Sequence, residues 1–298
     1  MVYTKLTPLC THGSRVEEIS RSSLHYRLVI SPGKADAYRL AQLDDYTQIP
    51  RRRLFLHRFG KGPSHPLETS LSLSARTSSD TIPGTWGFGL WNDPFGLSIG
   101  FGGKPFRLPA LPNAVWFFGA SEENYLSFKE PPGFDTPSAT QPAANGFLAQ
   151  SFRAPRFHPL LILAGMALPF SRKWTRRLMS QIVAEDGVQL WSPGARSHNA
   201  ASKMAESKAH RQVDGVQGKG VDPTQWHRYR LEWSPNRVSF DVDEVRVFES
   251  VVRPNPPLGL VIWIDNQYAA FTPEGRIGFG VLENPEPAWL EVKEVEVG

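Results

Sequence analysis

The chain has 298 residues, of which 40% are hydrophobic, enough to fill the core of one large domain or two small ones. The formal net charge is only +4 and the basic residues form short clusters instead of one long stripe, so nucleic acid is not an expected partner. A single cysteine, Cys10, excludes an intrachain disulfide and argues against a cysteine-based zinc site.

No targeting or membrane-spanning segment is expected. The first residues lack a basic region followed by an apolar run, which is the pattern of a secretory signal. The longest apolar stretch, 160–170, contains Pro169, and its 11 residues are too few to cross a bilayer. Cytoplasmic localisation is therefore the default expectation.

Short segments with strand character dominate the N-terminal part of the chain. The first two are 24–30 and 54–59. In 69–76, apolar residues alternate with serine, which is the period of a half-buried strand. Two further strands are predicted over 113–120 and 124–128.

The segment 85–93, T-W-G-F-G-L-W-N-D, is the most unusual of the predicted strands. At the period of a strand, one face is apolar and the other carries Gly87, Gly89 and Trp91. Two glycines on one face leave room for a ligand, or for another backbone, to approach the sheet closely.

The middle of the chain, about 129–222, is predicted to be an insertion across one end of the sheets. The part 129–156 is rich in Pro, Ala and Ser and is expected to be a long loop. Ser171 is the predicted N-cap of a helix near 171–185. One face of that helix is predicted to be an apolar stripe of Trp174, Leu178 and Ile182. Much of its remaining surface is basic and is formed by Arg172, Lys173, Arg176 and Arg177.

Three interpretations of this helix remain open. It packs on the sheets as a solvated helix, it covers a groove as a lid, or it rests on a membrane surface together with the apolar stretch before it. We favour the first, so membrane-surface contact is not an expected property of the chain.

The C-terminal third has the most regular alternation. Strands are predicted over 226–233, 238–242, 245–248, 258–265, 276–282 and 289–297. Asp243 and Glu244 form a two-residue hairpin turn between two of them. Many short strands separated by turns predict an all-β protein, a two-sheet antiparallel jelly-roll sandwich with a loop and helix insertion, as one domain over 1–298.

Residues 226–235, W-H-R-Y-R-L-E-W-S-P, with 238–243, V-S-F-D-V-D, resemble a strand pair of laminarinase-like glycoside hydrolases of family sixteen. These enzymes belong to the concanavalin A-like lectin/glucanase superfamily. Segment 85–92 is similar to the family's Gly- and Trp-rich inner strand, and 289–297 to its last strand. The resemblance implies two antiparallel sheets packed face to face, with one sheet curved into a substrate groove.

The same family carries its catalytic carboxylates in the pattern E-x-D-x-x-E. One serves as nucleophile and another as general acid, about 5.5 Å apart in retaining enzymes. This chain departs from the pattern, because no Glu or Asp occurs between Gly96 and Ala120. No catalytic residue of the family can therefore be carried over.

Two groups of residues are candidates for a ligand site. The first is Trp86, Trp91 and Trp116 with Asn92 and Asp93, because indole faces stack on sugar rings while neighbouring amide and carboxylate groups fix orientation. The alternative is that Trp86 and Trp116 are core residues and that the Asn-Asp-Pro run is a turn.

The second candidate follows the strand 258–265. Trp263 and Asp265 would face a groove if the isoleucines between them face the core, and Asn266 and Gln267 come next. A carboxylate beside an apolar indole can have a raised pKa and act as acid or base. The alternative is a strand-ending Asx turn with ordinary polar residues.

No metal ligand set is predicted. The eight histidines have no partner two or four residues away, and no cofactor is expected. A structural Ca²⁺ held by backbone oxygens would leave little trace in a sequence, and nothing here supports one.

Two functional hypotheses follow. The first is a carbohydrate-binding or glucanase-like protein without the usual catalytic carboxylate pair, with a glycan as partner. The second is an enzyme that acts on a small, partly apolar molecule in a helix-covered pocket, with Asp265 or Asp93 as acid or base. Whether the chain is an enzyme is left open by the sequence.

Overall fold

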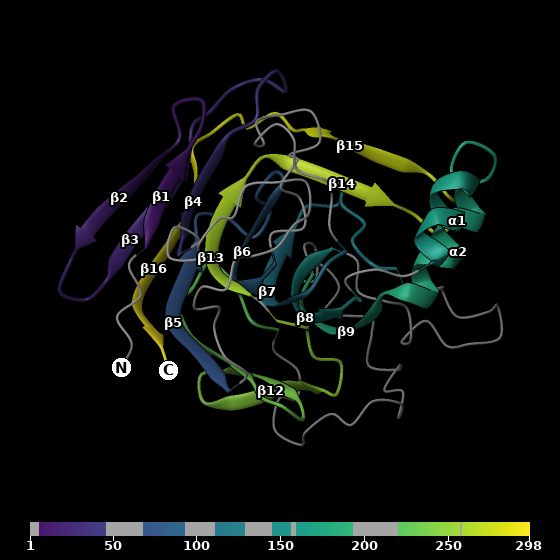
Figure 1. Cartoon of the computed structure of the whole chain (residues 1–298). Coiled ribbons are helices and arrows are strands. Elements are labelled where there is room, and N and C mark those ends of the chain that lie inside the picture. Colours follow the sequence, from purple (N-terminus) through teal and green to yellow (C-terminus); the bar gives the residue numbers. More distant parts are fainter. Residues whose placement is uncertain are drawn as a thin grey trace, which may run out of the picture.

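The computed structural model describes residues 6–45, 68–92, 111–128, 145–155, 159–192, 220–256 and 258–298. Two seven-stranded antiparallel sheets pack face to face (Figure 1). The predicted all-β, two-sheet jelly-roll sandwich is therefore confirmed. The predicted strand 54–59 lies outside the described residues.

The first sheet is the one that carries the predicted ligand-site residues. Its spatial order is β1 (Thr7–Cys10), β4 (Leu40–Asp44), β13 (Gly259–Asp265), β6 (Thr85–Trp91), β7 (Ala114–Ala120), β8 (Gly146–Arg153) and β9 (Ala184–Trp191). Strands distant in the sequence are thus neighbours, with β13 between β4 and β6.

The second sheet supplies the opposite half of the sandwich. Its order is β12 (Val245–Ser250), β11 (Val238–Val242), β10 (His227–Trp233), β5 (Thr69–Thr77), β16 (Ala288–Val297), β3 (His25–Ile30) and β2 (Arg15–Ser20). A separate two-stranded ribbon is formed by β14 (Gln267–Phe271) and β15 (Ile277–Val281).

The inner faces of the two sheets enclose the main hydrophobic core. Aromatic rings meet across the interface: Phe88 lies 5.1 Å from Tyr229, and Phe117 lies 5.3 Å from Phe240, between ring centroids. Alternation explains these contacts, since every second residue of a strand points into the sandwich. Ile262 and Ile264 belong to this core, which turns Trp263 to the outer face of the first sheet.

The predicted elements agree closely with the structure in the C-terminal third. Strand β11 has its predicted bounds, and Asp243 and Glu244 both have positive φ, as a two-residue hairpin turn requires. The predicted strand over 124–128 is wrong, because only Tyr125 forms an isolated bridge there, to Ala270.

The segment predicted as an insertion contributes to the first sheet. Strands β8 and β9 lie within it and form one edge of that sheet. The expectation of a loop over 129–156 is therefore corrected for Gly146–Arg153. Of 194–222, only the last residues are described.

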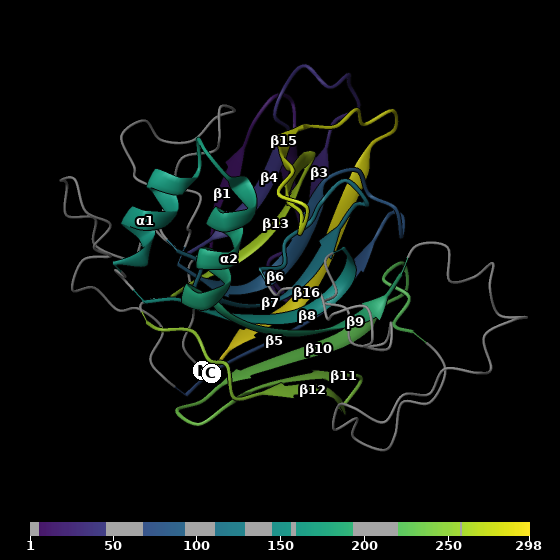
Figure 2. The same ribbon diagram turned by 90° about the vertical axis from the view of Figure 1, so that its right-hand side faces the viewer.

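Two short helices separate β8 from β9. They are α1 (Leu160–Ala167) and α2 (Arg172–Ile182), and Ser171 caps α2 as predicted, with its hydroxyl accepting from the Trp174 backbone N–H at 3.3 Å. The helix pair lies on the far side of the first sheet from β10, β11 and β12 (Figure 2). In the described part of the chain, neither helix has the length and apolarity needed to traverse a lipid bilayer.

Candidate functional site

The outer face of the first sheet carries most of the predicted site. In the strand register, Trp263 lies beside Gly87, which lies beside Phe118. One step along the strands, Gly89 lies beside Trp116. The sheet therefore brings Trp91, Trp116 and Trp263 together on one face, although the sequence places Trp263 in a separate candidate group.

The space above the two glycines is occupied by the chain itself. A Cβ at position 87 would lie 2.8 Å from Cη2 of Trp263, and one at position 89 would lie 2.6 Å from Cβ of Trp116. Both distances are shorter than any normal carbon contact. The nearest atoms are backbone oxygens of Phe117 and Val115, so the glycines make room for the neighbouring strand as well as for two tryptophan side chains.

The indoles of this face are packed against one another. Trp91 and Trp263 are stacked, with centroids 5.6 Å apart and planes 5° apart, and Trp116 lies 5.7 Å from Trp263. The indole N–H of Trp263 donates to the hydroxyl of Thr85 at 3.0 Å. Trp116 and Trp263 are each only 5% exposed. We name Trp91, Trp116, Trp263, Phe118 and Phe152 the outer aromatic cluster.

Trp86 points to the other face of the same sheet. It belongs to the main core, where its ring stacks on Phe147 at 4.8 Å. The ring lies over Gly119, because a Cβ there would be 2.1 Å from the Nε1 of Trp86. The sheet therefore separates Trp86 from Trp91 and Trp116, with which it was grouped.

Asn92 joins two strand ends. Its side-chain N–H donates to the carbonyl of Leu111 at 2.9 Å, and its Oδ1 accepts from the backbone N–H of Asn113 at 3.0 Å. Both ends of the amide are thereby engaged within the chain. Asp93 lies outside the described residues.

Asp265 is buried, and both of its carboxylate oxygens are engaged. Oδ1 accepts from the hydroxyl of Thr85 at 2.8 Å and from the backbone N–H of Gln267 at 3.2 Å, and Oδ2 accepts from the hydroxyl of Tyr38 at 3.2 Å. Burial raises the pKa of Asp265 from 3.8 to about 6, although these hydrogen bonds act in the opposite direction. The carboxylate joins β13 to β6 and to the chain before β4.

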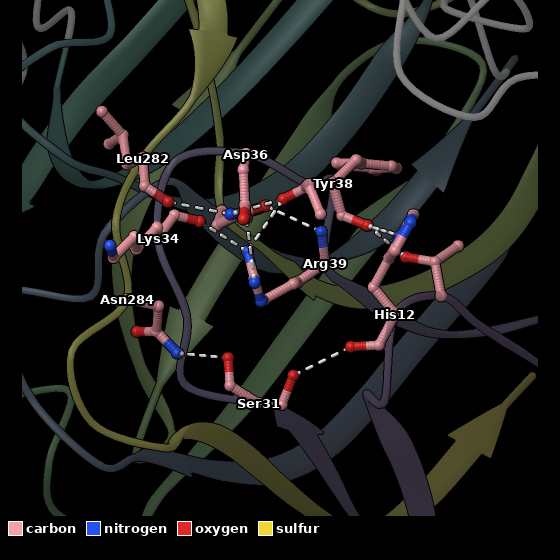
Figure 3. A network of polar contacts seen from close by, with 11 residues as sticks. His12, Ser31, Lys34, Asp36, Tyr38, Arg39, Leu282 and Asn284 are labelled. Atoms are coloured by element: carbon pink, nitrogen blue, oxygen red, sulfur yellow. Dashed lines mark hydrogen bonds and ion pairs between the residues drawn. The ribbon is translucent and has the colours of Figure 1, made fainter.

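The partner Tyr38 is held by a polar network around the 31–38 loop (Figure 3). The Arg39 guanidinium donates to the carbonyls of Lys34 and Ala37 at 2.8 and 3.0 Å. The backbone carbonyl of Tyr38 accepts from the hydroxyl of Thr11 at 2.6 Å. The loop that presents the Tyr38 hydroxyl to Asp265 is thus fixed from both sides.

Asn266 links the same loop to β15. It is fully buried, accepts from the Arg39 backbone N–H at 2.8 Å and donates to the carbonyl of Leu282 at 2.8 Å. Gln267 begins β14 and is half-buried. The Asp-Asn-Gln run therefore connects strands, which agrees with the alternative of an Asx turn.

A cavity of about 440 Å³ lies at one end of the sandwich, apart from the outer aromatic cluster. Trp86 and Phe147 form its apolar wall. The remaining lining residues come from loops and strand ends: Asp80, Thr81, Ile82, Pro83, Ala120, Ser121, Glu122, Glu123, Gly146, Pro223, Leu282 and Glu283.

The polar lining of this cavity is acidic. Among the described lining residues there are four carboxylates and no Lys, Arg or His. The turn that carries Glu122 and Glu123 is fixed by the buried Asn124, whose amide donates to the carbonyl of Gly84 at 3.2 Å and accepts from the backbone N–H of Ala269 at 3.0 Å. The cavity thus presents hydrogen-bond acceptors on a rigid frame beside an indole.

Sequence reasoning found Trp86 but missed the other residues of the cavity. They come from the end of β7, the start of β8 and the connections after β5, β7 and β15 and before β10. These segments are far apart in the sequence and share no local pattern. In the described ranges, no group of three or more His, Cys, Asp or Glu side chains is arranged to hold a metal ion.

No protein-family model and no curated protein sequence matches the chain. Among solved structures it is similar to a glycoside hydrolase family 16 endo-glucanase from Bacteroides ovatus (9% identity, TM-score 0.43, 100% of this chain and 96% of that one). It is also similar to a legume lectin-like domain from Entamoeba histolytica (9%, 0.40, 98% and 89%) and to a glycoside hydrolase family protein from Mycobacterium thermorestibile (12%, 0.37, 99% and 93%). At these TM-scores and identities, neither an activity nor a site residue is transferred to this chain.

Proposed function

We propose that this chain is a carbohydrate-binding protein and that its site is the cavity at the end of the sandwich. The observation that carries the proposal is an indole wall combined with a rim of carboxylates and hydroxyls around about 440 Å³. That volume lies in the range of small-molecule sites, roughly 300 to 1,000 Å³. Sugars offer apolar C–H faces to a ring and hydroxyl donors to acceptors, which is what these residues complement.

The charge of the cavity selects among saccharides. Since Asp80, Glu122, Glu123 and Glu283 have no basic neighbour among the described lining residues, acidic and sulfated sugars are disfavoured. Neutral sugars are favoured, because their hydroxyls donate charge-assisted hydrogen bonds to carboxylates.

Binding is favoured over hydrolysis by the exposure of these acids. Glu122, Glu123 and Glu283 are exposed to solvent. A general acid in a glycosidase needs apolar surroundings that keep it protonated near neutral pH. Water-exposed carboxylates do not provide this.

The acid or base role for Asp265 has less support. Its raised pKa suits such a role, but its oxygens are engaged by Thr85, Gln267 and Tyr38, and it does not line the cavity. Asp265 fits a structural link between strands better.

Isothermal titration with cellobiose, laminaribiose and glucosamine tests the proposal. The Glu122→Gln/Glu123→Gln variant should bind a neutral disaccharide about tenfold more weakly than wild type, because two charge-assisted acceptors become neutral ones. Glu274→Gln is the matched control, since Glu274 is an exposed acid outside the cavity. Binding of glucosamine alone would identify a site for cations and reject the proposal.

A further inference from the structure

The helix hairpin α1–α2 exposes an unusual amount of apolar surface. In the described part of the chain, 5 of the 11 exposed large hydrophobic residues lie in this one hairpin, namely Leu163, Met166, Leu168, Phe170 and Trp174. Phe170 is 89% exposed and Trp174 is 62% exposed. We name these five residues the hairpin apolar patch. Exposed apolar side chains gathered in one short segment are typical of an interaction surface.

The hairpin is held in an orientation that turns two polar residues of α2, Thr175 and Arg176, inward. Arg176 is only 1% exposed, its guanidinium donates to the carbonyl of Phe271, and it lies 5.3 Å from the ring centroid of Tyr125. The hydroxyl of the buried Thr175 donates to the carbonyl of Ala164 at 3.1 Å. The predicted faces of α2 are thus corrected: Arg176 is buried, whereas Trp174 faces solvent.

At Trp174 and Arg176, α2 departs from an ordinary surface helix, which buries its apolar residues and exposes its arginines. The contact of Arg176 with β14 fixes the orientation of α2, so the exposure of Trp174 follows from a defined interaction of the fold. A partner that removes the rings of Phe170 and Trp174 from water would therefore be bound favourably by the hydrophobic effect.

The charges beside the patch indicate the chemistry of that partner. Arg172, Lys173 and Arg177 are exposed, and no Asp or Glu occurs from 159 to 184. A second copy of the chain would place these cations against one another, which opposes association. A partner with an apolar layer and anionic groups at its edge is complementary to both the exposed apolar side chains and the exposed cations.

We propose that the hairpin docks on the surface of an anionic lipid bilayer. Phe170 and Trp174 enter the interface between headgroups and acyl chains, where aromatic side chains are favoured. Arg172, Lys173 and Arg177 contact the anionic headgroups. The proposal does not depend on what the end cavity binds.

Vesicle co-sedimentation of the full chain tests this. The probes are vesicles of phosphatidylcholine alone and vesicles with about 30 mol% phosphatidylserine. Wild type should bind only the anionic vesicles, and binding should weaken as salt is raised. Phe170→Ser/Trp174→Ser should bind roughly tenfold more weakly or worse, and Arg172→Gln/Lys173→Gln/Arg177→Gln should lose about fivefold for each cation.

Ile19→Ser/Val251→Ser is the matched control, because both residues are exposed and lie outside the hairpin. It should bind as wild type does. Near-ultraviolet circular dichroism establishes that each variant is folded. The proposal is overturned if folded wild type does not sediment with anionic vesicles, or if Phe170→Ser/Trp174→Ser binds as tightly as wild type. Sedimentation velocity that shows a dimer lost in the same variant, without vesicle binding, would assign the patch to a second copy.

Discussion

The two outer faces of the sandwich have opposite chemistry. The first sheet carries the outer aromatic cluster, whereas the second carries a network of ion pairs. At the centre of that network, the carboxylate of Glu291, which is 3% exposed, accepts from His25 at 2.7 Å, from Arg27 at 3.2 Å and from Arg76 at 3.1 Å. The Arg76 guanidinium also lies 4.8 Å from the ring centroid of Trp226.

The difference shows why the tryptophans of the first sheet do not face water. The second sheet faces water, so its arginines and glutamates pair there. The outer aromatic cluster is covered by further apolar residues, among them Met179 and Val183 at the end of α2. Its indoles therefore form a second core. Trp86 and Phe147 are also buried in a core, at 5% and 2% exposed, but these two rings contribute to the lining of the end cavity.

Removing the centre of the outer aromatic cluster should have the largest effect on stability. We expect Trp263→Ala to lower the free energy of unfolding by about 3 to 5 kcal/mol, because it leaves a cavity among buried rings. Trp174→Ala, at an exposed indole, should cost less than about 1 kcal/mol. Urea unfolding measures both. Equal effects would mean that the cluster is not a core.

Asp265, in the first sheet, should make the free energy of unfolding depend on pH. Its pKa of about 6 in the folded chain lies above the ordinary value of 3.8, so folding favours the protonated form. The stabilisation is complete below about pH 4 and is lost as the pH rises through 6. The expected loss is roughly 3 kcal/mol, at about 1.4 kcal/mol for each pKa unit.

Asp265→Asn should remove this part of the pH dependence, because the amide stays neutral. Thermal unfolding between pH 4 and 7 measures it. Asp36→Asn is the control, since that side chain is 70% exposed. An unchanged slope in Asp265→Asn would show that another group titrates.

Glu291, in the second sheet, should make the free energy of unfolding depend on pH in the opposite direction. Burial raises the pKa of Glu291, but hydrogen bonds from His25, Arg76 and Arg27 lower it by more, so the net pKa lies below its ordinary value. Its stabilisation is present above about pH 4.5 and is lost as the pH falls.

We expect Glu291→Gln to cost roughly 1.5 to 3 kcal/mol at pH 7, the usual range for hydrogen bonds to a charged group, and to cost less in acid. Denaturant unfolding at the two pH values measures this. Glu18→Gln, at an exposed ion pair with Arg21, should cost less than about 1 kcal/mol. A cost for Glu291→Gln that is independent of pH would contradict the assignment.

The sequence predicted the fold well wherever alternation was regular. Leu71, Leu73, Tyr229 and Leu231 all lie in the main core, as their period of two indicates. Strands β8 and β9 were missed, because β8 is buried on both faces and β9 is rich in polar residues, so neither alternates clearly.

The site was harder to predict because it depends on contacts between distant segments. A buried arginine such as Arg176 is satisfied by the carbonyl of a residue 95 positions away, so local pattern assigns it to solvent. The indoles were recognised, but a period of two cannot tell which face of a sheet is covered by other elements. The acidic rim of the cavity comes from loops with no shared motif.

The most direct test of the account is to follow the indole N–H signals in a two-dimensional NMR spectrum during titration with a neutral disaccharide. The chain has nine tryptophans, and Trp→Phe variants assign the signals. If the ligand binds in the end cavity, the Trp86 signal shifts with saturation, while the signals of Trp91, Trp116 and Trp263 stay in place. Saturable shifts of those three signals with an unmoved Trp86 would contradict the account and place the ligand on the outer face of the first sheet.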